Sequence, residues 1–269
     1  MMTPSRSALS LQDAPPIPLK LIIDKVWKIR SVLFTAPAIV FLTVLMACIS
    51  LICSLWDRTG NTQHRLARAW SRMLLAVGFV RCKVSGAEKL DQSASYVLVS
   101  NHASYMDTPA IVSSIPLQFR FFAKKGLFSI PFLGWHLGRS GHLPVIRDDP
   151  RASLKTMSEG ARIMQQRCVS LLLFPEGGRS PRDMRPFKEG AAYIAIKAGV
   201  PVVPIGIVNA RVVLPMHEWI VRPGIIEINV GEPILTAGLT ARDRGRLNEM
   251  LEEKVAELAR QRIVTPTSA

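Results

Sequence analysis

The stretch YVLVSNHASYMD, from Tyr96 to Asp107, decides the class of fold. It starts as a short apolar and β-branched run, which is typical of a strand buried in a sheet. Polar residues follow at once, and the pattern becomes helical from Ser104, with Asp107 in the expected first turn. A strand that leads through a polar loop into a helix is the repeating unit of α/β folds, which bind ligands in such loops.

Six further β-rich runs extend this pattern toward both ends of the chain: residues 82–84, 118–123, 142–146, 169–174, 202–208 and 225–230. Helical patterns cover residues 150–167 and 188–198, and a charged amphipathic one covers residues 241–262. The alternation predicts an α/β fold with a largely parallel central sheet flanked by helices. We assign this domain to residues 81–269.

The segment before the domain predicts a membrane anchor. We expect a flexible basic tail at residues 1–30, then an anchoring helix and an amphipathic interfacial helix at residues 31–80. Residues 32–56 are 25 residues without a charged side chain. As a helix they would extend about 38 Å, compared with about 30 Å for the hydrocarbon core of a bilayer. The run is too long for the core of a cleaved signal peptide, which indicates a permanent anchor.

The orientation of this anchor stays open, because basic residues flank both of its ends. A single tilted span is one arrangement. A helix that bends at Pro37 and leaves on the cytoplasmic face by which it entered is the other.

The interfacial helix is predicted by two opposite faces. The apolar face contains Leu66, Trp70, Met73 and Val77. The basic face contains Arg65, Arg68 and Arg72. Such a helix suits the lipid interface, and the alternative is a helix packed on the domain with a solvated basic face.

Charge is concentrated in the middle of the chain. The net charge is +14, and residues 57–199 carry 21 basic and 10 acidic side chains. This excess indicates an anionic partner, which could be membrane phosphate, nucleic acid or a substrate. The five histidines form no His-Glu-x-x-His pattern, so no metal site is predicted.

Two loops after predicted strands carry residues suited to chemistry. His102 precedes the helix in which Asp107 begins, so the carboxylate could lean back toward the imidazole. Read alone, however, this segment favours a helix cap with an ordinary loop histidine. The second loop, Pro175 to Ser180, has two glycines and Arg179, a planar donor suited to phosphate. Read alone, that loop favours a solvated turn.

Taken together, these motifs resemble a family, the membrane-associated glycerolipid acyltransferases, especially the 1-acylglycerol-3-phosphate acyltransferases of bacterial type. NHASYMD resembles their Asn-His-x-x-x-x-Asp motif, and FPEGGRS, residues 174–180, resembles Phe-Pro-Glu-Gly-x-Arg-Ser. KKGLFSIPFLGW and LPVIR resemble a third block, and VPVVPIGI, residues 200–207, a fourth. The blocks cover about residues 95–210 in the family's order, and one departure is Gly126, where many relatives carry Glu.

The resemblance implies an enzyme that moves a fatty acyl group from acyl-CoA or acyl carrier protein to 1-acylglycerol-3-phosphate, which gives phosphatidic acid. His102 would be the general base and Asp107 its orienting carboxylate. Glu176, Gly177 and Arg179 would line the acceptor site, and Arg147, Lys125 and Lys188 would help to hold its phosphate. No protein nucleophile, cofactor or metal is implied. The expected location is the cytoplasmic face of the inner membrane, with bilayer, lysophospholipid and acyl donor as partners and no nucleic acid.

Three alternatives remain at this stage. The acceptor could be another lyso-lipid, such as lyso-ornithine lipid. A membrane-bound hydrolase could also use a His/Asp pair, although it would need a metal cluster or nucleophile that the sequence does not offer. A basic protein that only binds membrane or nucleic acid would explain the charge but not the ordered motifs.

Overall fold

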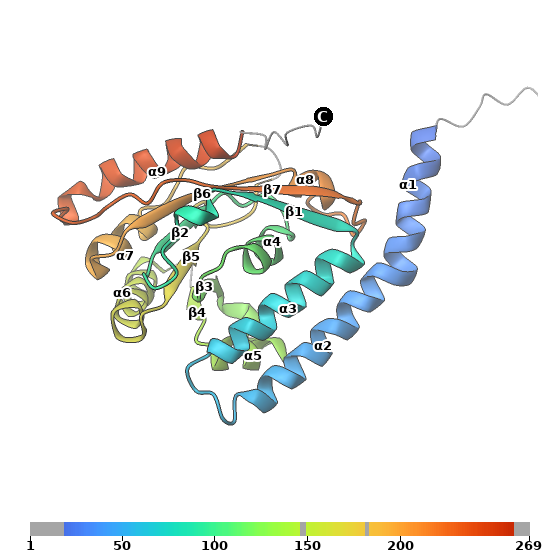
Figure 1. Cartoon of the computed structure of the whole chain (residues 1–269), viewed down its shortest axis with the longest axis horizontal. Helices are drawn as coiled ribbons and strands as arrows, with labels where there is room; N and C mark the ends of the chain where they lie inside the picture. Colours follow the sequence, from blue (N-terminus) through green and yellow to red (C-terminus); the bar gives the residue numbers. More distant parts are fainter. Residues whose placement is uncertain (1–18, 146–148, 181–182, 261–269) are drawn as a thin grey trace, which may run out of the picture.

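The computed structural model describes residues 19–145, 149–180 and 183–260. Its centre is a seven-stranded sheet in the order β1-β7-β6-β2-β5-β3-β4 (Figure 1). The strands are β1 Val80–Ser85, β2 Val97–Ser100, β3 Phe119–Lys124, β4 Leu143–Val145, β5 Ser170–Leu173, β6 Val202–Val208 and β7 Gly224–Val230. Every strand predicted from the sequence is present, with ends within two residues of those expected.

Five neighbouring strands, β6, β2, β5, β3 and β4, run parallel. Strand β7 is antiparallel to β6, and β1 is parallel to β7. The prediction of a largely parallel α/β sheet is therefore confirmed. The five parallel strands end on one side of the sheet, which we call the carboxyl edge, so the loops after β2 and β5 lie next to each other there.

Helices cover both faces of the sheet (Figure 1). One face carries α3 Asn61–Val77 and α4 Asp107–Ser114, and the other carries α6 Pro150–Arg167, α7 Gly190–Ala198 and α9 Arg244–Leu258. Shorter elements are α5 Leu133–Arg139, α8 Ala210–Val213 and the 3-10 helices η3 Ala87–Lys89, η4 Lys125–Ser129 and η5 Ala241–Asp243. Each face has its own apolar core, so β2, between them, has all four residues buried.

The chain enters the fold through one long helix. Helix α1 Leu19–Arg30, a π-helical turn at Ser31–Thr35 and α2 Ala36–Cys53 follow each other without a break. The prediction of a flexible tail is thus wrong for residues 19–30, while residues 1–18 lie outside the described ranges. The helix bends between α1 and α2 (Figure 1), where the π-turn and Pro37, which has no N–H, interrupt regular hydrogen bonding. It does not fold back there, because the chain reverses only at residues 54–60.

Small and polar side chains form the face of this helix that packs on the domain. The buried members of that face are Ser31, Thr35, Ala47, Ser50 and Ser54. Large apolar side chains point the other way, for example Leu33 and Phe41, which are 75% and 66% exposed. Within the described ranges, Ile22–Cys53 is the one helix long and apolar enough to cross a membrane. A helix that contacts lipid typically has small residues on the side facing the protein and large apolar residues on the outward side.

Helix α3 lies between α2 and α4 (Figure 1). The indole Nε1 of Trp70 donates to Thr43 Oγ1 of α2 at 3.1 Å. Arg68 was expected on a basic outer face, and this is wrong, because its guanidinium donates to three carbonyl oxygens at the end of α4: Val112, Ile115 and Leu117. Arg65 and Arg72 are exposed. Helix α3 therefore joins the N-terminal helix to the domain.

Candidate active site

Asn101 fixes the start of the loop that follows β2. Its Nδ2 donates to the Ile207 carbonyl at 3.0 Å, and its Oδ1 accepts the Ile207 N–H at 2.7 Å. These two bonds tie the loop to the neighbouring strand β6. The next residue, His102, thereby has a well-defined position at the carboxyl edge.

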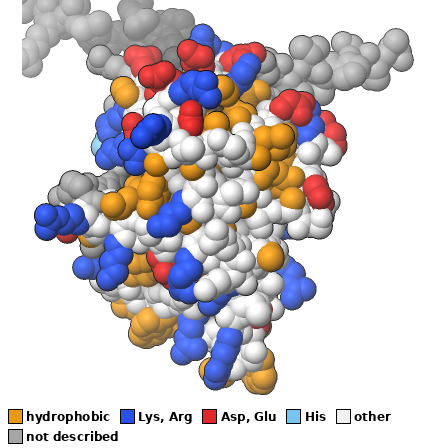
Figure 2. Space-filling model, turned by 90° about the vertical axis from the view of Figure 1, so that its left-hand side faces the viewer, with side chains coloured by type: hydrophobic (Ala, Val, Ile, Leu, Met, Phe, Trp, Pro, Cys, Tyr) orange, Lys and Arg blue, Asp and Glu red, His pale blue; other side chains and the backbone are white. Residues whose placement is uncertain are grey.

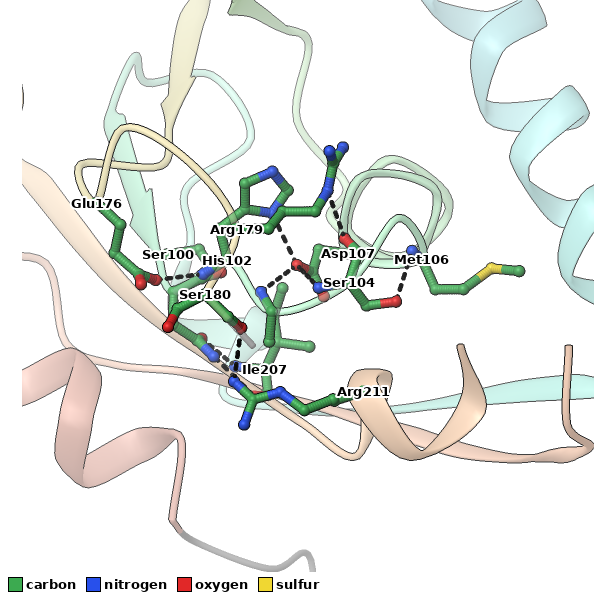
Figure 3. Close-up of polar contacts among 12 residues, drawn as sticks. Ser100, His102, Ser104, Met106, Asp107, Glu176, Arg179, Ser180, Ile207 and Arg211 are labelled. Atoms are coloured by element: carbon green, nitrogen blue, oxygen red, sulfur yellow. Dashed lines mark hydrogen bonds and ion pairs between the residues drawn. The ribbon is translucent and has the colours of Figure 1, made fainter. Parts of the chain in front are cut away.

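The structure brings His102 and Asp107 together. Nδ1 of His102 lies 2.7 Å from Oδ2 of Asp107, whose side chain is fully buried. The same oxygen accepts the N–H groups of Ala103 and Ser104 at 2.7 and 2.8 Å. Because this oxygen acts as an acceptor, Nδ1 of the neutral imidazole carries the proton and Nε2 keeps its lone pair. Nε2 is turned away from Asp107 (Figure 3), as a proton acceptor for substrate must be.

The sequence predicted a helix from Ser104 with Asp107 in its first turn, and this is only partly correct: the Asp107 carboxylate accepts the Ser104 N–H, but the helix begins later. Helix α4 begins at Asp107, with Met106 as its N-cap. The hydroxyl of Ser104 instead accepts the Met106 N–H and donates to the Leu214 carbonyl. The extra turn before the helix lets the Asp107 side chain point back along the chain, toward the loop amides and the imidazole.

Phe174 supports the other side of the histidine. Its ring is stacked on the imidazole of His102, with centroids 4.0 Å apart and 16° between the planes. Phe174 follows β5, so the stack joins the two loops at the carboxyl edge. The imidazole is thus held by a carboxylate at one nitrogen and by a ring on one face.

Glu176 links the same two loops through its carboxylate. Oε1 accepts the His102 N–H at 2.6 Å, and Oε2 accepts the Arg185 N–H at 2.9 Å. In return, the N–H of Ser180 donates to the His102 carbonyl at 3.2 Å. Burial raises the pKa of Glu176, and the amide donors of Arg185 and His102 oppose the rise. The sequence suggested a lining of the acceptor site, whereas both oxygens of this carboxylate bond to backbone.

Gly177 makes room for a basic side chain. Its φ is +71°, a conformation that favours glycine, and a Cβ there would lie 3.1 Å from Cε and 3.2 Å from Nζ of Lys188. The Lys188 N–H donates to the Pro175 carbonyl at 3.0 Å. Lys188, predicted as a phosphate ligand, therefore lies directly against the glycine turn.

Arg179 extends from the second loop over the first (Figure 3). Its Nε donates to the Ser104 carbonyl at 3.2 Å, and its guanidinium carbon lies 3.9 Å from the centre of the Tyr105 ring. The contact with Tyr105 has cation–π geometry, which fixes the plane of the guanidinium. A predicted phosphate ligand is thus placed on the His102 loop itself.

The remaining basic residues differ in their positions. Lys125 is exposed at the start of η4, directly after β3 and thus at the carboxyl edge. Arg147 lies outside the described residues. The sequence reasoning missed Arg211, whose Nη2 donates to the Ser180 carbonyl at 3.0 Å. Arg211 lies three residues after β6. The expectation that ligand-binding residues follow the strands of a parallel sheet pointed to the other two loops, and it would also have identified Arg211.

These contacts define a class of site: a buried His/Asp pair whose imidazole Nε2 is turned away from the carboxylate, beside a glycine turn and several cations. The family model described as Acyltransferase matches residues 81–208, which contain both motifs. An acyltransferase of Schizosaccharomyces pombe is 31% identical over 194 residues, which are 71% of this chain and 68% of that protein. The chain belongs to this acyltransferase family.

Two plant relatives have more specific names. A chloroplastic 1-acyl-sn-glycerol-3-phosphate acyltransferase of Brassica napus is 34% identical and covers 67% of this chain, and one of Arabidopsis thaliana is 32% identical and covers 77%. The aligned part is 53% and 59% of their lengths, so the chain spans little more than half of each. In fold, it is similar to a 1-acyl-sn-glycerophosphate acyltransferase of Thermotoga maritima, with a TM-score of 0.72 at 24% identity over 88% of this chain and all of that one.

Proposed function

We propose that this protein transfers a fatty acyl group to the free hydroxyl of 1-acyl-sn-glycerol-3-phosphate and so makes phosphatidic acid. The observation that carries the proposal is the His102–Asp107 contact of 2.7 Å, in a family whose named relatives catalyse this reaction. The donor is an acyl thioester, acyl-CoA or acyl carrier protein, and the reaction uses no cofactor or metal.

The chemistry follows from the imidazole geometry. Nε2 of His102 takes the proton of the acceptor hydroxyl while the hydroxyl oxygen bonds to the thioester carbonyl carbon. Asp107 stabilises the imidazolium through Nδ1. When the tetrahedral intermediate collapses, the C–S bond breaks and the thiolate takes the proton back from Nε2. The products are the ester and a free thiol, and His102 returns to its starting state.

The acceptor phosphate would bind to the cations around the glycine turn. Arg179 presents a planar guanidinium fixed on Tyr105, and Lys188 lies against Gly177. A phosphomonoester carries more negative charge than a phosphodiester and accepts two bonds from one guanidinium. Lys125 and Arg147 are further candidates, since both follow strands of the parallel set. This charge favours 1-acylglycerol-3-phosphate over a zwitterionic lyso-lipid.

The site would work at the cytoplasmic face of the inner membrane, where thioester donors are made. The N-terminal helix bonds to the domain at Ser31, which contacts Val221, and at Ser50, which contacts His136. These two points are about 28 Å apart along the helix. A perpendicular span would therefore draw α3 and α5 into the hydrocarbon core. We infer that the helix lies along the membrane surface, with its outward apolar face in lipid.

A panel assay tests the proposal. Purified full-length protein receives one long-chain acyl thioester and, in turn, 1-acylglycerol-3-phosphate, a lysophosphodiester and lyso-ornithine lipid. We expect thiol release that depends on the acceptor and is fastest with the phosphomonoester. A preference for lyso-ornithine lipid would change the acceptor, and thiol release without any acceptor would indicate a thioesterase.

A further inference from the structure

The carboxyl edge also carries a segment whose large apolar side chains point outward, at residues 127–135 between β3 and the body of α5. We call it the aromatic loop. Leu127, Ile130, Phe132 and Trp135 are 37%, 45%, 40% and 58% exposed. The segment starts where β3 ends, on the same side of the sheet as His102. An apolar group of this size beside an active site marks a contact surface.

The backbone of the aromatic loop has a strained conformation at Phe132. Phe132 has φ +62° and ψ −54°, a conformation that side-chain residues rarely adopt, and the Leu133 N–H donates to the Pro131 carbonyl at 2.7 Å across it. The turn is close, since a Cβ on Gly134 would lie 2.1 Å from the Phe128 carbonyl oxygen. Such a conformation costs about 1 to 3 kcal/mol and persists where it serves a function.

The aromatic loop is joined to the N-terminal helix through α5. Nδ1 of His136, next to Trp135, lies 2.7 Å from Ser50 Oγ of α2. Helix α5 packs on α2 through this contact, so the loop is fixed relative to the helix. Helix α5, which carries Trp135, therefore lies beside α2, whose large apolar side chains are exposed.

The tryptophans of the chain gather around the same helix. Trp27 lies in this helix, Trp56 follows it directly, and Trp70 donates to its Thr43. Trp135 and Trp219 lie within two residues of His136 and Val221, which also bond to the helix. Trp56, Trp135 and Trp219 are 77%, 58% and 86% exposed. Exposed tryptophan concentrates at membrane interfaces, because the ring is apolar and its N–H is polar.

Charge distinguishes lipid from a second copy of the chain as the occupant. Residues 108–147 contain no Asp or Glu. Lys124, Lys125 and Arg139 are exposed at the two ends of the segment. Two copies that met through this surface would bring like charges together, whereas anionic head groups would neutralise them. Charge is uneven on a wider surface as well, since basic side chains are scattered over the whole face shown in Figure 2, while acidic ones lie mostly toward its top.

From these observations we propose that the aromatic loop is a second lipid contact, which inserts Phe132 and Trp135 into the interface of an anionic membrane beside the N-terminal helix. The inference rests on the proposed membrane enzyme and assigns it a surface beyond its anchor. It places the entrance to the His102 site against lipid on the β3 side, so an acyl chain could enter without crossing water.

The test uses full-length protein and its partition onto vesicles of phosphatidylglycerol and phosphatidylethanolamine, without substrate. The variant is Phe132→Asn with Trp135→Gln. Asn tolerates positive φ better than Phe, so this variant should fold at least as stably in detergent. The matched control is Leu235→Asn, because Leu235 is 72% exposed but follows β7 at the opposite edge. We expect the double variant to lose at least tenfold in partition and the control less than twofold.

A second measurement uses Trp135→Phe, which should remove part of the tryptophan fluorescence that brominated lipid quenches. Equal partition of wild type and double variant, or an equal loss in the control, would overturn the proposal. So would a wild-type dimer that the double variant converts to monomer, or binding to an acidic protein in place of vesicles. Partition is measured without turnover, so transfer to a short-chain soluble acceptor reports the proposed function separately.

Discussion

The loops of the carboxyl edge and the N-terminal helix are stabilised in different ways. In the loops, many polar groups bond to one another, some within a few residues, as Asp107 does to His102, Ala103 and Ser104, and some between loops, as Glu176 does to the His102 N–H. The helix contacts the domain through a few bonds that are distant in sequence, such as Trp70 with Thr43 and Ser50 with His136. Changes in the loops should therefore alter chemistry, and changes at the helix should alter stability and membrane binding.

The largest effect should come from the imidazole. His102→Ala removes the proposed base, and general-base catalysis contributes about 10²- to 10⁴-fold, so kcat/KM should fall by up to about 10⁴-fold. The backbone N–H and carbonyl that bond to Glu176 and Ser180 remain, so the thermal midpoint should change little. A folded variant that keeps most of its acyl transfer would contradict the mechanism.

Asp107→Asn should cost nearly as much, about 10³-fold in kcat/KM. The amide oxygen can still accept the N–H groups of Ala103 and Ser104, so the loop should keep its shape. It carries no negative charge with which to stabilise the imidazolium that forms at His102. The check is steady-state kinetics beside circular dichroism, and wild-type kcat at neutral pH would show that the carboxylate has no catalytic part.

The two regions also differed in how far the sequence predicted them. Strand ends follow from local patterns, because alternation acts over a few residues. The spacing of His102 and Asp107 allowed their pairing, but only the resemblance to the acyltransferase family favoured it. The role of Arg68 did not follow from local patterns, since its three carbonyl partners lie 44 to 49 residues away. The helix at residues 19–30 was not predicted, because its closely spaced charged residues are also typical of a flexible tail. Only its continuation into the apolar helix shows that it is helical. The sequence also did not show that two backbone amides bond to the Glu176 carboxylate, since these partners lie 74 and 9 residues away.

Acid should weaken the part of the domain that packs on the N-terminal helix. Burial lowers the pKa of His64 to about 3, that of His136 to about 4, and that of His142 well below 6.5; Arg120 also lowers the pKa of His64 and His142. The unfolded chain therefore binds more protons, and stability falls as pH drops below about 6.5. Each group contributes up to about 1.4 kcal/mol per pH unit until its folded pKa is reached.

Urea unfolding in detergent between pH 7 and 5 measures this loss, which should be a few kcal/mol. His136→Gln should reduce the slope with pH, because Gln can bond to Ser50 without taking up a proton. An identical slope in wild type and variant would show that His136 does not titrate on unfolding in this range.

Arg179 offers a smaller effect in the loops. Charge-assisted hydrogen bonds contribute about 1.5 to 3 kcal/mol, so Arg179→Ala should lower kcat/KM at least about tenfold with a phosphomonoester acceptor. Arg179→Lys should also impair transfer, since a point charge neither forks to phosphate nor stacks on Tyr105 as the guanidinium does. Kinetics on phosphomonoester and ornithine acceptors should show the loss with the first only. Equal losses of kcat/KM with both acceptors would indicate that Arg179 supports the structure of the loop and does not bind the acceptor phosphate.

The smallest effect should come from the bond between α2 and α3, and it tests whether the helix region really depends on single distant contacts. Thr43 Oγ1 accepts the Trp70 N–H at 3.1 Å and donates to the Ile39 carbonyl at 2.7 Å. Thr43→Val keeps the shape of the side chain but leaves the indole N–H without this acceptor. A net hydrogen bond is worth about 1 kcal/mol, so unfolding free energy in detergent should fall by about that amount, with kcat unchanged. In a double-mutant cycle with Trp70→Phe, the coupling should be about 0.5 to 1 kcal/mol. Zero coupling would mean that shape alone holds α2 on α3, and a fall in kcat would mean that the two regions are less separate than their contacts indicate.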